Sequence, residues 1–496
     1  MARTPLFKAL RRAMLQSGAG APRALSRRSF LAMSAALAAC QGRVDAGDVA
    51  IVGGGTAGLT AAFRLQAAGR AVTLYEASDR FGGRMFTRRD FNEDGQFCEL
   101  GGELVDTNHE ALRNLAAELG VEIQRVAPEG GQEFYHVNGR LYTQQDMIGA
   151  DGQGGFARLA PRIAEDQAKL LDAEENWTDH ARALDQVSLA DYLARLSNLA
   201  PAWAMEVIDV AYRGEFGLET RQQSALNLVD FISTETSHGF HVFGESDEAF
   251  RIGGGSSSLP DALAARLGQA PLRPRHVLVA IARSDAGVRL TFDSPEGRIT
   301  REHARVILAL PFTKLRQVEG FDTLGLAEEQ VRAIRELGYG DNSKLMVSTR
   351  ARPWTTQRWP APSVGAFYSD EFQLAWETSR GQNGERGILT NFLQNQDNRT
   401  AALNTLRRGL RRFSPASAEA LDESKLAFMV WRQQPFTLGS YAAARVGQYT
   451  TLLENTATPS SDGRIHFAGE HTSIDFLGFM NGAVESGERV AAEILA

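Results

Sequence analysis

The sequence predicts an α/β fold with a Rossmann-like, dinucleotide-binding domain. Three patterns in its 496 residues favour this fold. A glycine-rich turn joins an apolar strand to a helix within residues 48–76, as in a βαβ unit. Residues 274–312 alternate apolar and polar side chains like an antiparallel meander. Residues 108–251 have mostly helical patterns, and the length allows about two or three domains.

The overall composition argues against several classes of function. The net charge of −7 disfavours general nucleic-acid binding, which requires a basic surface. The two cysteines are Cys40 and Cys98, and the sequence has no C-x-x-C pair, H-E-x-x-H, G-x-S-x-G or G-K-S/T motif. We therefore expect no metal centre, serine hydrolase or nucleoside triphosphatase.

The first 39 residues resemble a twin-arginine export signal. Arg27 and Arg28 precede an apolar run of about eleven residues, which is too short to span a bilayer and ends in small residues. The "LAAC" sequence resembles a lipoprotein box in which Cys40 is acylated, and residues 40–47 would form a polar tether. We expect a periplasmic, membrane-anchored protein. The alternative is an amphipathic leader with a chance Arg-Arg pair.

The glycine-rich turn has the spacing of a dinucleotide cradle. Residues 48–52 have the pattern of a buried strand, and Gly53, Gly55 and Gly58 form G-x-G-x-x-G before a helical stretch at residues 60–68. The first glycine allows a tight turn, the second lets backbone amides approach a pyrophosphate, and the third lets the helix pack on the strand. The alternative is a glycine-rich turn in an unrelated α/β unit.

The residues after the second strand indicate which dinucleotide binds. Glu76 ends that strand and can accept hydrogen bonds from both ribose hydroxyls. The sequence continues with Gly82, Gly83 and Arg84, which resembles the G-G-R sequence that follows the ribose acid in FAD enzymes. Arg84 would reach the phosphate or flavin side of the cofactor. We therefore expect FAD rather than NAD.

Both ends of the chain resemble the flavin-dependent amine oxidase family, which includes monoamine oxidases, polyamine oxidases and L-amino acid oxidases. The resemblance rests on "GGGTAGL" and "YEASDRFGGR" near the start and on "IHFAGEHTSIDFLGFMNGAVESGERVAAEIL" at the end. It implies a two-dinucleotide-binding FAD domain with an inserted α+β substrate domain. The FAD domain would comprise residues 48–107, 252–334 and 434–496, and the substrate domain residues 108–251 and 335–433.

The resemblance also implies the cofactor contacts. "CELGGELV" matches the stretch whose backbone borders the flavin, and "GFMNGA" starts a helix whose N-terminus faces the flavin ring. A positive helix end would stabilise negative charge there. Besides the cradle glycines and Glu76, the expected FAD contacts are Ala77, Arg84, Gly101, Gly102, Val277, Trp431, Glu470, Gly478, Phe479 and Met480.

Lysine is rare in this chain, with five lysines against 48 arginines. Lys344 begins an apolar stretch that resembles the family strand with an active-site lysine, ten residues before Trp354. The family lysine holds a water against the reactive ring nitrogen of the flavin. Burial favours the neutral amine, a form that an arginine does not adopt. The alternative is a strand-end lysine that reaches solvent.

Two aromatic residues match the substrate cage of the family. Tyr441 follows Trp431 by ten residues, and Phe479 stands at the second cage position. Two rings over one flavin face would form a slot for an amine. The alternative is that both are ordinary core aromatics. His238 and His241 fall in a segment that borders the substrate in some relatives, but histidines on a surface loop are the favoured interpretation.

Two positions depart from the patterns of particular relatives. Ser440 stands where some monoamine oxidases have a cysteine bonded to FAD, so we expect non-covalent FAD. Leu104 stands where L-amino acid oxidases have an arginine that binds the substrate carboxylate, which weakens the amino-acid interpretation.

The sequence thus predicts an FAD-dependent amine oxidase. The amine carbon would give a hydride to the flavin, and the imine would hydrolyse to an aldehyde or keto product with ammonia or a smaller amine. Oxygen would accept the electrons and form hydrogen peroxide. One alternative is L-amino acid oxidation, and another is a dehydrogenase that passes electrons to a periplasmic cytochrome or quinone. A flavin-binding protein without turnover is a third, against which Lys344, Tyr441 and Phe479 argue.

Overall fold

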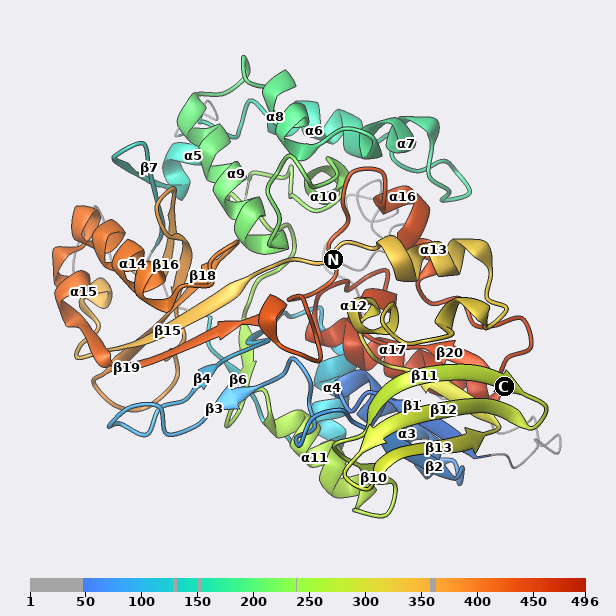
Figure 1. Cartoon of the computed structure of the whole chain (residues 1–496). Coiled ribbons are helices and arrows are strands. Elements are labelled where there is room, and N and C mark those ends of the chain that lie inside the picture. Colours follow the sequence, from blue (N-terminus) through green and yellow to red (C-terminus); the bar gives the residue numbers. More distant parts are fainter. Residues whose placement is uncertain (1–47, 128–131, 150–153, 238, 357–362) are drawn as a thin grey trace.

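Two large sheets, one parallel and one mixed, organise the molecule (Figure 1). The structure, a computed structural model, describes residues 48–127, 132–149, 154–237, 239–356 and 363–496. The expected export signal, Cys40 and the tether lie outside these residues. In the described part of the chain, no helix is both long and apolar enough to cross a membrane.

The parallel sheet has five strands in the order β10-β2-β1-β14-β20. Side chains alternate between its two faces along β1, so Val49 and Ile51 lie in one core cluster and Ala50 and Val52 in another. The glycine-rich turn follows β1 at the carboxyl edge, where open α/β sheets bind ligands. The strands, in sheet order, are Leu272–Arg273, Val72–Tyr75, Val49–Val52, Arg305–Leu308 and Ile465–Phe467.

Helices cover one face of the parallel sheet. Helix α3 contacts both α11 and α17, which brings the first and last segments of the chain side by side. The core between these helices and the sheet is rich in leucine, alanine and valine. The helices are α3 (Thr56–Ala67), α4 (Glu110–Leu119), α11 (Ser258–Leu267) and α17 (Met480–Leu495).

The predicted meander is confirmed and covers the other face of the parallel sheet. It has three antiparallel strands, β11 (Val277–Ser284), β12 (Gly287–Ser294) and β13 (Gly297–His303). Their turns fall at "SDAG" and "SPEG". The chain then enters β14, so the meander leads directly back into the parallel sheet.

The mixed sheet has seven strands in the order β19-β15-β18-β17-β16-β7-β8. Helices α14 (Arg399–Phe413) and α15 (Pro415–Ala420) pack against it through an apolar core. The strands, in sheet order, are Leu421–Val430, Ser343–Thr349, Gly387–Leu393, Gln373–Glu377, Ser363–Ser369, Gln132–Val137 and Arg140–Thr143.

Short helices gather beyond the mixed sheet, at the top of Figure 1. They confirm the helical pattern predicted in residues 108–251. They are α5 (Gln144–Ile148), α6 (Ala160–Gln167), α7 (Asp179–Asp185), α8 (Leu189–Arg195), α9 (Ala202–Phe216) and α10 (Leu226–Val229). The remaining elements are β3 (Thr87–Arg88), β4 (Cys98–Glu99), β5 (Leu104–Val105), β6 (Ile123–Arg125), β9 (Phe250–Ile252), α12 (Phe312–Leu315), α13 (Glu328–Glu336) and α16 (Tyr449–Leu452).

The α/β fold that the sequence predicts is confirmed, with one change at the first helix. Helix α3 begins at Thr56 rather than at residue 60, so Gly58 lies inside its first turn. The third glycine of the motif thus belongs to the helix, whereas the helix start expected from the sequence had placed it in the turn. The division into FAD and substrate domains stays a prediction.

Candidate active site

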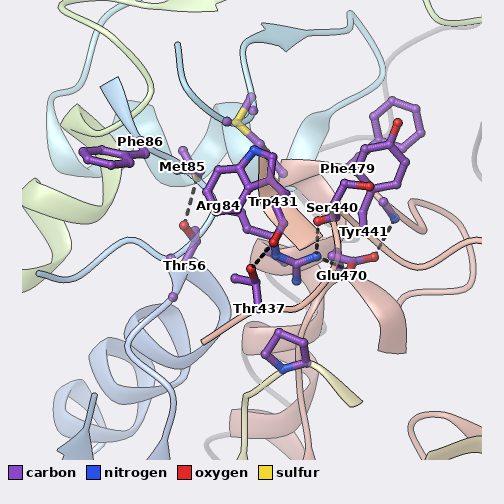
Figure 2. Close-up of a pocket in the computed structure, with 18 of the residues that line it drawn as sticks. Thr56, Arg84, Met85, Phe86, Trp431, Thr437, Ser440, Tyr441, Glu470 and Phe479 are labelled. Atoms are coloured by element: carbon purple, nitrogen blue, oxygen red, sulfur yellow. Dashed lines mark hydrogen bonds and ion pairs between the residues drawn. The ribbon is translucent and has the colours of Figure 1, made fainter. Parts of the chain in front are cut away.

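A cavity of about 730 Å³ extends from the turn after β1 to the mixed sheet. Its walls include every expected site residue within the described chain except Gly58. Figure 2 shows part of this wall, where the segment around Arg84 meets the segments around Trp431 and Phe479. The cavity therefore brings together residues that the sequence places in four separate segments.

The glycine-rich turn is packed so closely that two of its positions exclude a side chain. Gly53 has a φ of +112°, and a Cβ there would lie 2.4 Å from the Ala309 carbonyl oxygen. A Cβ at Gly58 would lie 2.0 Å from the Gly53 carbonyl oxygen. A Cβ at Gly55, in contrast, would meet nothing closer than 4.0 Å. Gly55 borders the cavity at the N-terminus of α3, where free N–H groups favour a phosphate.

Backbone amides hold the Glu76 carboxylate at the end of β2. Gly54 N donates to Oε2 at 2.6 Å, and Ser78 N donates to Oε1 at 2.8 Å. Ala77 and Val277 line the same part of the cavity. The Ser78 hydroxyl also donates to Oε1 at 2.8 Å, whereas Oε2 keeps a further lone pair that can accept a hydrogen bond from a ligand hydroxyl.

An ion pair joins the first and last segments of the cavity wall. Arg84 Nη1 lies 2.7 Å from Glu470 Oε1 and donates to the Ser440 carbonyl oxygen at 2.8 Å (Figure 2). Gly478 N donates to Glu470 Oε2 at 2.9 Å, which fixes the approach to α17. The first turn of α17, which begins at Met480, has no acidic residue. Its partial positive charge therefore acts on the cavity without a competing side chain.

The expected flavin-bordering stretch also depends on glycine. A Cβ at Gly101 would lie 1.8 Å from a backbone carbonyl oxygen, and one at Gly102 would lie 2.8 Å from Met480 Cγ. Trp431 Nε1 donates to the Leu100 carbonyl oxygen at 2.9 Å. These contacts place the backbone of Gly101 and Gly102, the Trp431 indole and the N-terminus of α17 on one side of the cavity.

Lys344 lies on β15 inside the molecule, with an exposed fraction of 3%. The alternative of a lysine that reaches solvent is therefore wrong. Nζ donates to the Gly101 carbonyl oxygen at 2.9 Å and lies 2.8 Å from Glu103 Oε2. The sequence allowed for a neutral amine or a protonated form of this lysine, and the structure adds Glu103, which was not expected, at ion-pair distance.

Glu103 is the ion-pair partner of Lys344. Trp376 Nε1 donates to Oε1 at 3.0 Å, and the Thr378 hydroxyl donates to the same oxygen. Burial alone would raise the pKa of this carboxyl, but the Lys344 charge and the hydrogen bonds from Lys344, Thr378 and Trp376 outweigh it. The pKa of Glu103 is therefore lowered from its ordinary value. The pair places a positive donor at the cavity wall, 5.4 Å from the centroid of the Trp376 ring.

Tyr441 and Phe479 line the cavity together (Figure 2). A Cβ at Gly478 would lie 3.2 Å from the Tyr441 ring, so this ring packs against the residue that directly precedes Phe479. The Tyr441 hydroxyl donates to the Glu215 carbonyl oxygen, and the Phe479 ring packs 5.2 Å from the His109 ring. Both rings are fixed by these contacts, and their role as a substrate cage stays a prediction.

Some residues that the sequence singled out lie away from the cavity. Trp354 is fully buried in the core beside the mixed sheet, and its Nε1 donates to Glu377 Oε2 at 2.6 Å. His241 is exposed and does not line the cavity, which agrees with a surface loop. His238 lies outside the described residues.

Several polar residues of the cavity wall were missed from the sequence. Glu103 had a signal, because it directly follows the two glycines of the flavin-bordering stretch. The others come from strands, helices and loops that no motif connects. They are Glu133, Glu215, Asp247, Glu248, Tyr368, Trp376 and Arg380.

The described residues fit FAD. Two helix N-termini without acidic first turns, those of α3 and α17, lie on the cavity, and Glu76 Oε2 keeps a lone pair for a ribose hydroxyl. The side chain of Ser440 has no thiol and donates its hydroxyl to Asn342 Oδ1 at 2.6 Å. A thioether link to the cofactor is therefore impossible at this position.

Comparisons with known proteins agree with this site. Residues 56–495 match the family described as flavin-containing amine oxidoreductase. An L-amino-acid oxidase from Siganus canaliculatus is 26% identical over 475 residues, covering 90% of this chain and 85% of that protein. A nicotine dehydrogenase from Pseudomonas putida is 28% identical over 456 residues, covering 90% and 88%.

Among solved structures, wild-type putrescine oxidase bound to putrescine is similar with a TM-score of 0.75 and 25% identity. The alignment covers 90% of this chain and 99% of that one. Because the family match spans most of the sequence and the cavity fits the cofactor, the chain belongs to the flavin-containing amine oxidoreductases and is an FAD-dependent enzyme.

Proposed function

We propose that the enzyme oxidises an amine to an imine, which water then hydrolyses to an aldehyde or keto product and ammonia or a smaller amine. Bound FAD supplies the acceptor for the hydride that leaves the amine carbon. Oxygen takes up the electrons and becomes hydrogen peroxide. The single observation that carries this proposal is that Lys344, Tyr441 and Phe479 share one cavity with the dinucleotide cradle.

The two aromatic rings support the proposal through their position. The Tyr441 ring packs against Gly478, which directly precedes Phe479 at the N-terminus of α17. Aromatic faces attract ammonium groups, and a narrow apolar slot strips water from the amine. The rings would therefore select an aliphatic amine and orient the carbon that loses hydride.

Lys344 supports the proposal through its charge and its donors. Its ammonium makes one hydrogen bond to Gly101 and one to Glu103, and it has three N–H donors in all. The third donor can hold a water molecule in the cavity. Together with the N-terminus of α17, this cation would stabilise negative charge that develops on that side of the site.

The direct test of the proposal is product stoichiometry with the purified holoenzyme in air. For an oxidase, each mole of amine consumed yields one mole of carbonyl product and one of hydrogen peroxide. A panel of primary amines, polyamines and L-amino acids gives the substrate range. Absence of a carbonyl product from every member of the panel would contradict the proposal.

A dehydrogenase is the second candidate, and the similarity to a nicotine dehydrogenase favours it. The amine chemistry would be the same, but a cytochrome or quinone would accept the electrons. Reoxidation in air distinguishes the two functions. A flavin that stays reduced for minutes in oxygenated buffer, yet is oxidised at once by an artificial quinone, identifies the dehydrogenase.

An L-amino acid substrate is the third candidate. Arg380 lines the cavity and could bind a carboxylate in place of the arginine that is missing at Leu104. The similarity to an L-amino-acid oxidase agrees with this candidate. Turnover of L-amino acids that exceeds turnover of the corresponding amines lacking the carboxylate would favour it.

The proposal extends to the location of the enzyme. The twin-arginine sequence and Cys40 would deliver the folded holoenzyme to the periplasm and anchor it by a lipid. Cell fractionation of the full chain and of Cys40→Ser tests both parts. The variant should be released to the soluble periplasm, and an unchanged distribution contradicts the anchor.

A further inference from the structure

Carboxyl groups gather at the end of the cavity formed by the mixed sheet and its helices. Glu133 lies on β7, Glu215 on α9 and Glu248 on the loop before β9, so three separate elements supply them. All three line the same cavity as Lys344, and Asp247 joins them. The facing positive group is Arg380. Four acidic side chains thus accompany one guanidinium in this group of lining residues.

Two of these carboxylates have no partner within the described chain. No described residue donates a hydrogen bond or forms an ion pair with the side chain of Glu215 or Glu248. Glu133 differs, because the Tyr135 hydroxyl donates to its Oε2 at 3.0 Å. Glu215 is half-buried and Glu248 is exposed. Glu215 and Glu248 thus present unused acceptors to the cavity.

The buried tyrosine Tyr368 also belongs to the wall of this cavity. Tyr368, on β16, is 7% exposed and lines the cavity, and no described residue hydrogen-bonds to its hydroxyl. Burial raises the pKa of this phenol, and the charges of Glu133, Glu215 and Glu248, which line the same cavity, add to the shift. A phenol oxygen and carboxylate oxygens are acceptors for an ammonium group.

Apolar side chains line the same cavity. Phe216, Phe231, Phe243 and Leu374 line it. The cage itself contacts the cluster, because the Tyr441 hydroxyl donates to the backbone carbonyl oxygen of Glu215. One ligand can therefore reach from the cage, along an apolar stretch, to the carboxylates.

We infer that the enzyme acts on an aliphatic amine with a second cationic group, a diamine or polyamine, whose distal ammonium binds Glu215, Glu248 and Tyr368. This inference rests on the proposed amine oxidation and names the substrate class of the same site. The amine that is oxidised lies at Tyr441 and Phe479, and the methylene chain packs on the phenylalanines. The distal ammonium donates to the two free carboxylates and to the Tyr368 oxygen.

The electrostatics of the unliganded cluster agree with a cationic ligand. Burial, reinforced by Asp106, raises the pKa of Glu215 to about 7. Burial and Asp106 also raise the pKa of Glu248 to about 8, although the side chain is open to the cavity and Arg380 opposes the shift. A bound ammonium would favour the ionised carboxylates. The ligand would therefore offset the free-energy cost that burial places on ionising these groups.

The test compares α,ω-diamines with alkylamines in which a methyl group replaces the second amine. Putrescine and n-pentylamine form one such pair, and longer pairs cover the length of the cavity. Anaerobic flavin reduction gives the affinity and rate for each. We expect the best diamine to have a kcat/KM at least about tenfold above its alkylamine, as for a hydrogen bond to a charged group. Equal values would overturn the inference and leave the proposed amine oxidation intact.

Single substitutions test whether Glu215 and Glu248 bind the distal ammonium. Glu215→Gln and Glu248→Gln should each reduce kcat/KM for the diamine by about tenfold and change the alkylamine value by less than about threefold. Glu245→Gln, an exposed residue on the same loop, is the matched control and should change neither. Equal losses for both substrates, with unchanged FAD content, would overturn the assignment of these residues.

Binding without turnover separates this inference from the proposed function. A bis(trimethylammonium) alkane cannot be oxidised through an N–H amine, and it should raise the melting temperature of the holoenzyme more than the mono-cationic analogue does. If no amine reduces the flavin, the proposed function fails by itself. If L-norleucine, which has no distal cation, is a better substrate than every diamine, the inference fails while amine oxidation stands.

Discussion

At the scale of single residues, the pairing of Lys344 with Glu103 is the least expected feature of the site. Three segments hold it, since Trp376 and Thr378 donate to the carboxylate and Gly101 accepts from the lysine. The ammonium is therefore a fixed part of the cavity wall. Its effect on catalysis should appear in reactions of negatively charged species and less in cofactor affinity.

Replacement of the lysine separates these two effects. Lys344→Met keeps the length of the side chain and removes the charge and the water-binding donor. Reoxidation by oxygen should slow by at least about tenfold, which is about 1.4 kcal/mol on the barrier, while FAD content stays unchanged. Stopped-flow mixing of the reduced enzyme with oxygen measures this. Unchanged oxygen kinetics would remove the lysine from the mechanism.

The stability of the pair is tested by a double-mutant cycle. Glu103→Gln or Lys344→Met alone leaves one buried charge without its partner, which destabilises a protein by about 3 kcal/mol. The double variant has no unpaired charge, so it should be more stable than the sum of the single changes implies. Denaturant unfolding of the four proteins gives the coupling. Additive changes would mean that the two groups do not form an ion pair in solution.

At the scale of elements, the segment from β1 into α3 contains one glycine that the fold requires and another that leaves room for the cofactor. A Cβ at Gly58 would collide with the Gly53 carbonyl oxygen at 2.0 Å, whereas a Cβ at Gly55 would meet nothing closer than 4.0 Å. The same substitution should therefore have different consequences three residues apart. Sequence spacing alone treats the two glycines as parts of one motif.

The paired substitutions make this difference measurable. Gly55→Ala should leave the thermal stability of the apoprotein unchanged and weaken FAD binding by at least about tenfold, because the methyl group enters the space of the pyrophosphate. Gly58→Ala should lower the stability of the apoprotein itself by separating α3 from the strand. Titration of apoprotein with FAD and thermal unfolding provide the readouts. Equal losses of stability in both variants would contradict the assignment.

Local elements were predictable because their signals are local. The strand, turn and helix around Gly53, the meander with its two turns and the strand that begins near Lys344 all follow from short patterns. The one shift, the start of α3 at Thr56, arose because a glycine was assigned to the turn although it occupies the first turn of the helix. The residues expected to contact the cofactor lie in motifs, and except for Gly58 the structure places them around one cavity.

The carboxylate cluster was not predictable in this way. Glu133, Glu215 and Glu248 come from a strand, a helix and a loop, and each alone resembles a surface acid. Only the packing of these elements turns them toward one cavity. Substrate specificity in this chain therefore depends on tertiary structure, whereas cofactor choice can be inferred from sequence.

At the scale of the whole molecule, the cluster should make stability depend on pH. The pKa values of Glu215 and Glu248, about 7 and about 8, exceed the ordinary value of 4.5 because of burial and of Asp106, with Arg380 opposing the shift at Glu248 and Glu133 adding to it. The folded protein then binds more protons than the unfolded chain between these values. Stability should therefore fall as the pH rises from about 4.5 to about 8.

Thermal unfolding of the holoenzyme across this pH range checks the prediction. The double variant Glu215→Gln, Glu248→Gln has no carboxyl group to ionise at these positions, so its melting temperature should fall less steeply over the same range. Glu245→Gln should keep the slope of the unchanged protein. An identical slope in the double variant would show that other groups control the pH dependence.

The central claim is that this cavity holds FAD and presents it to an amine. Anaerobic addition of an amine panel to the purified holoenzyme tests it most directly, with the visible flavin absorption as the readout. The account predicts a yellow protein whose absorption band bleaches with at least one amine, most rapidly with a diamine or polyamine. A colourless protein that cannot be reconstituted with FAD, or a yellow one that no amine bleaches, would contradict it.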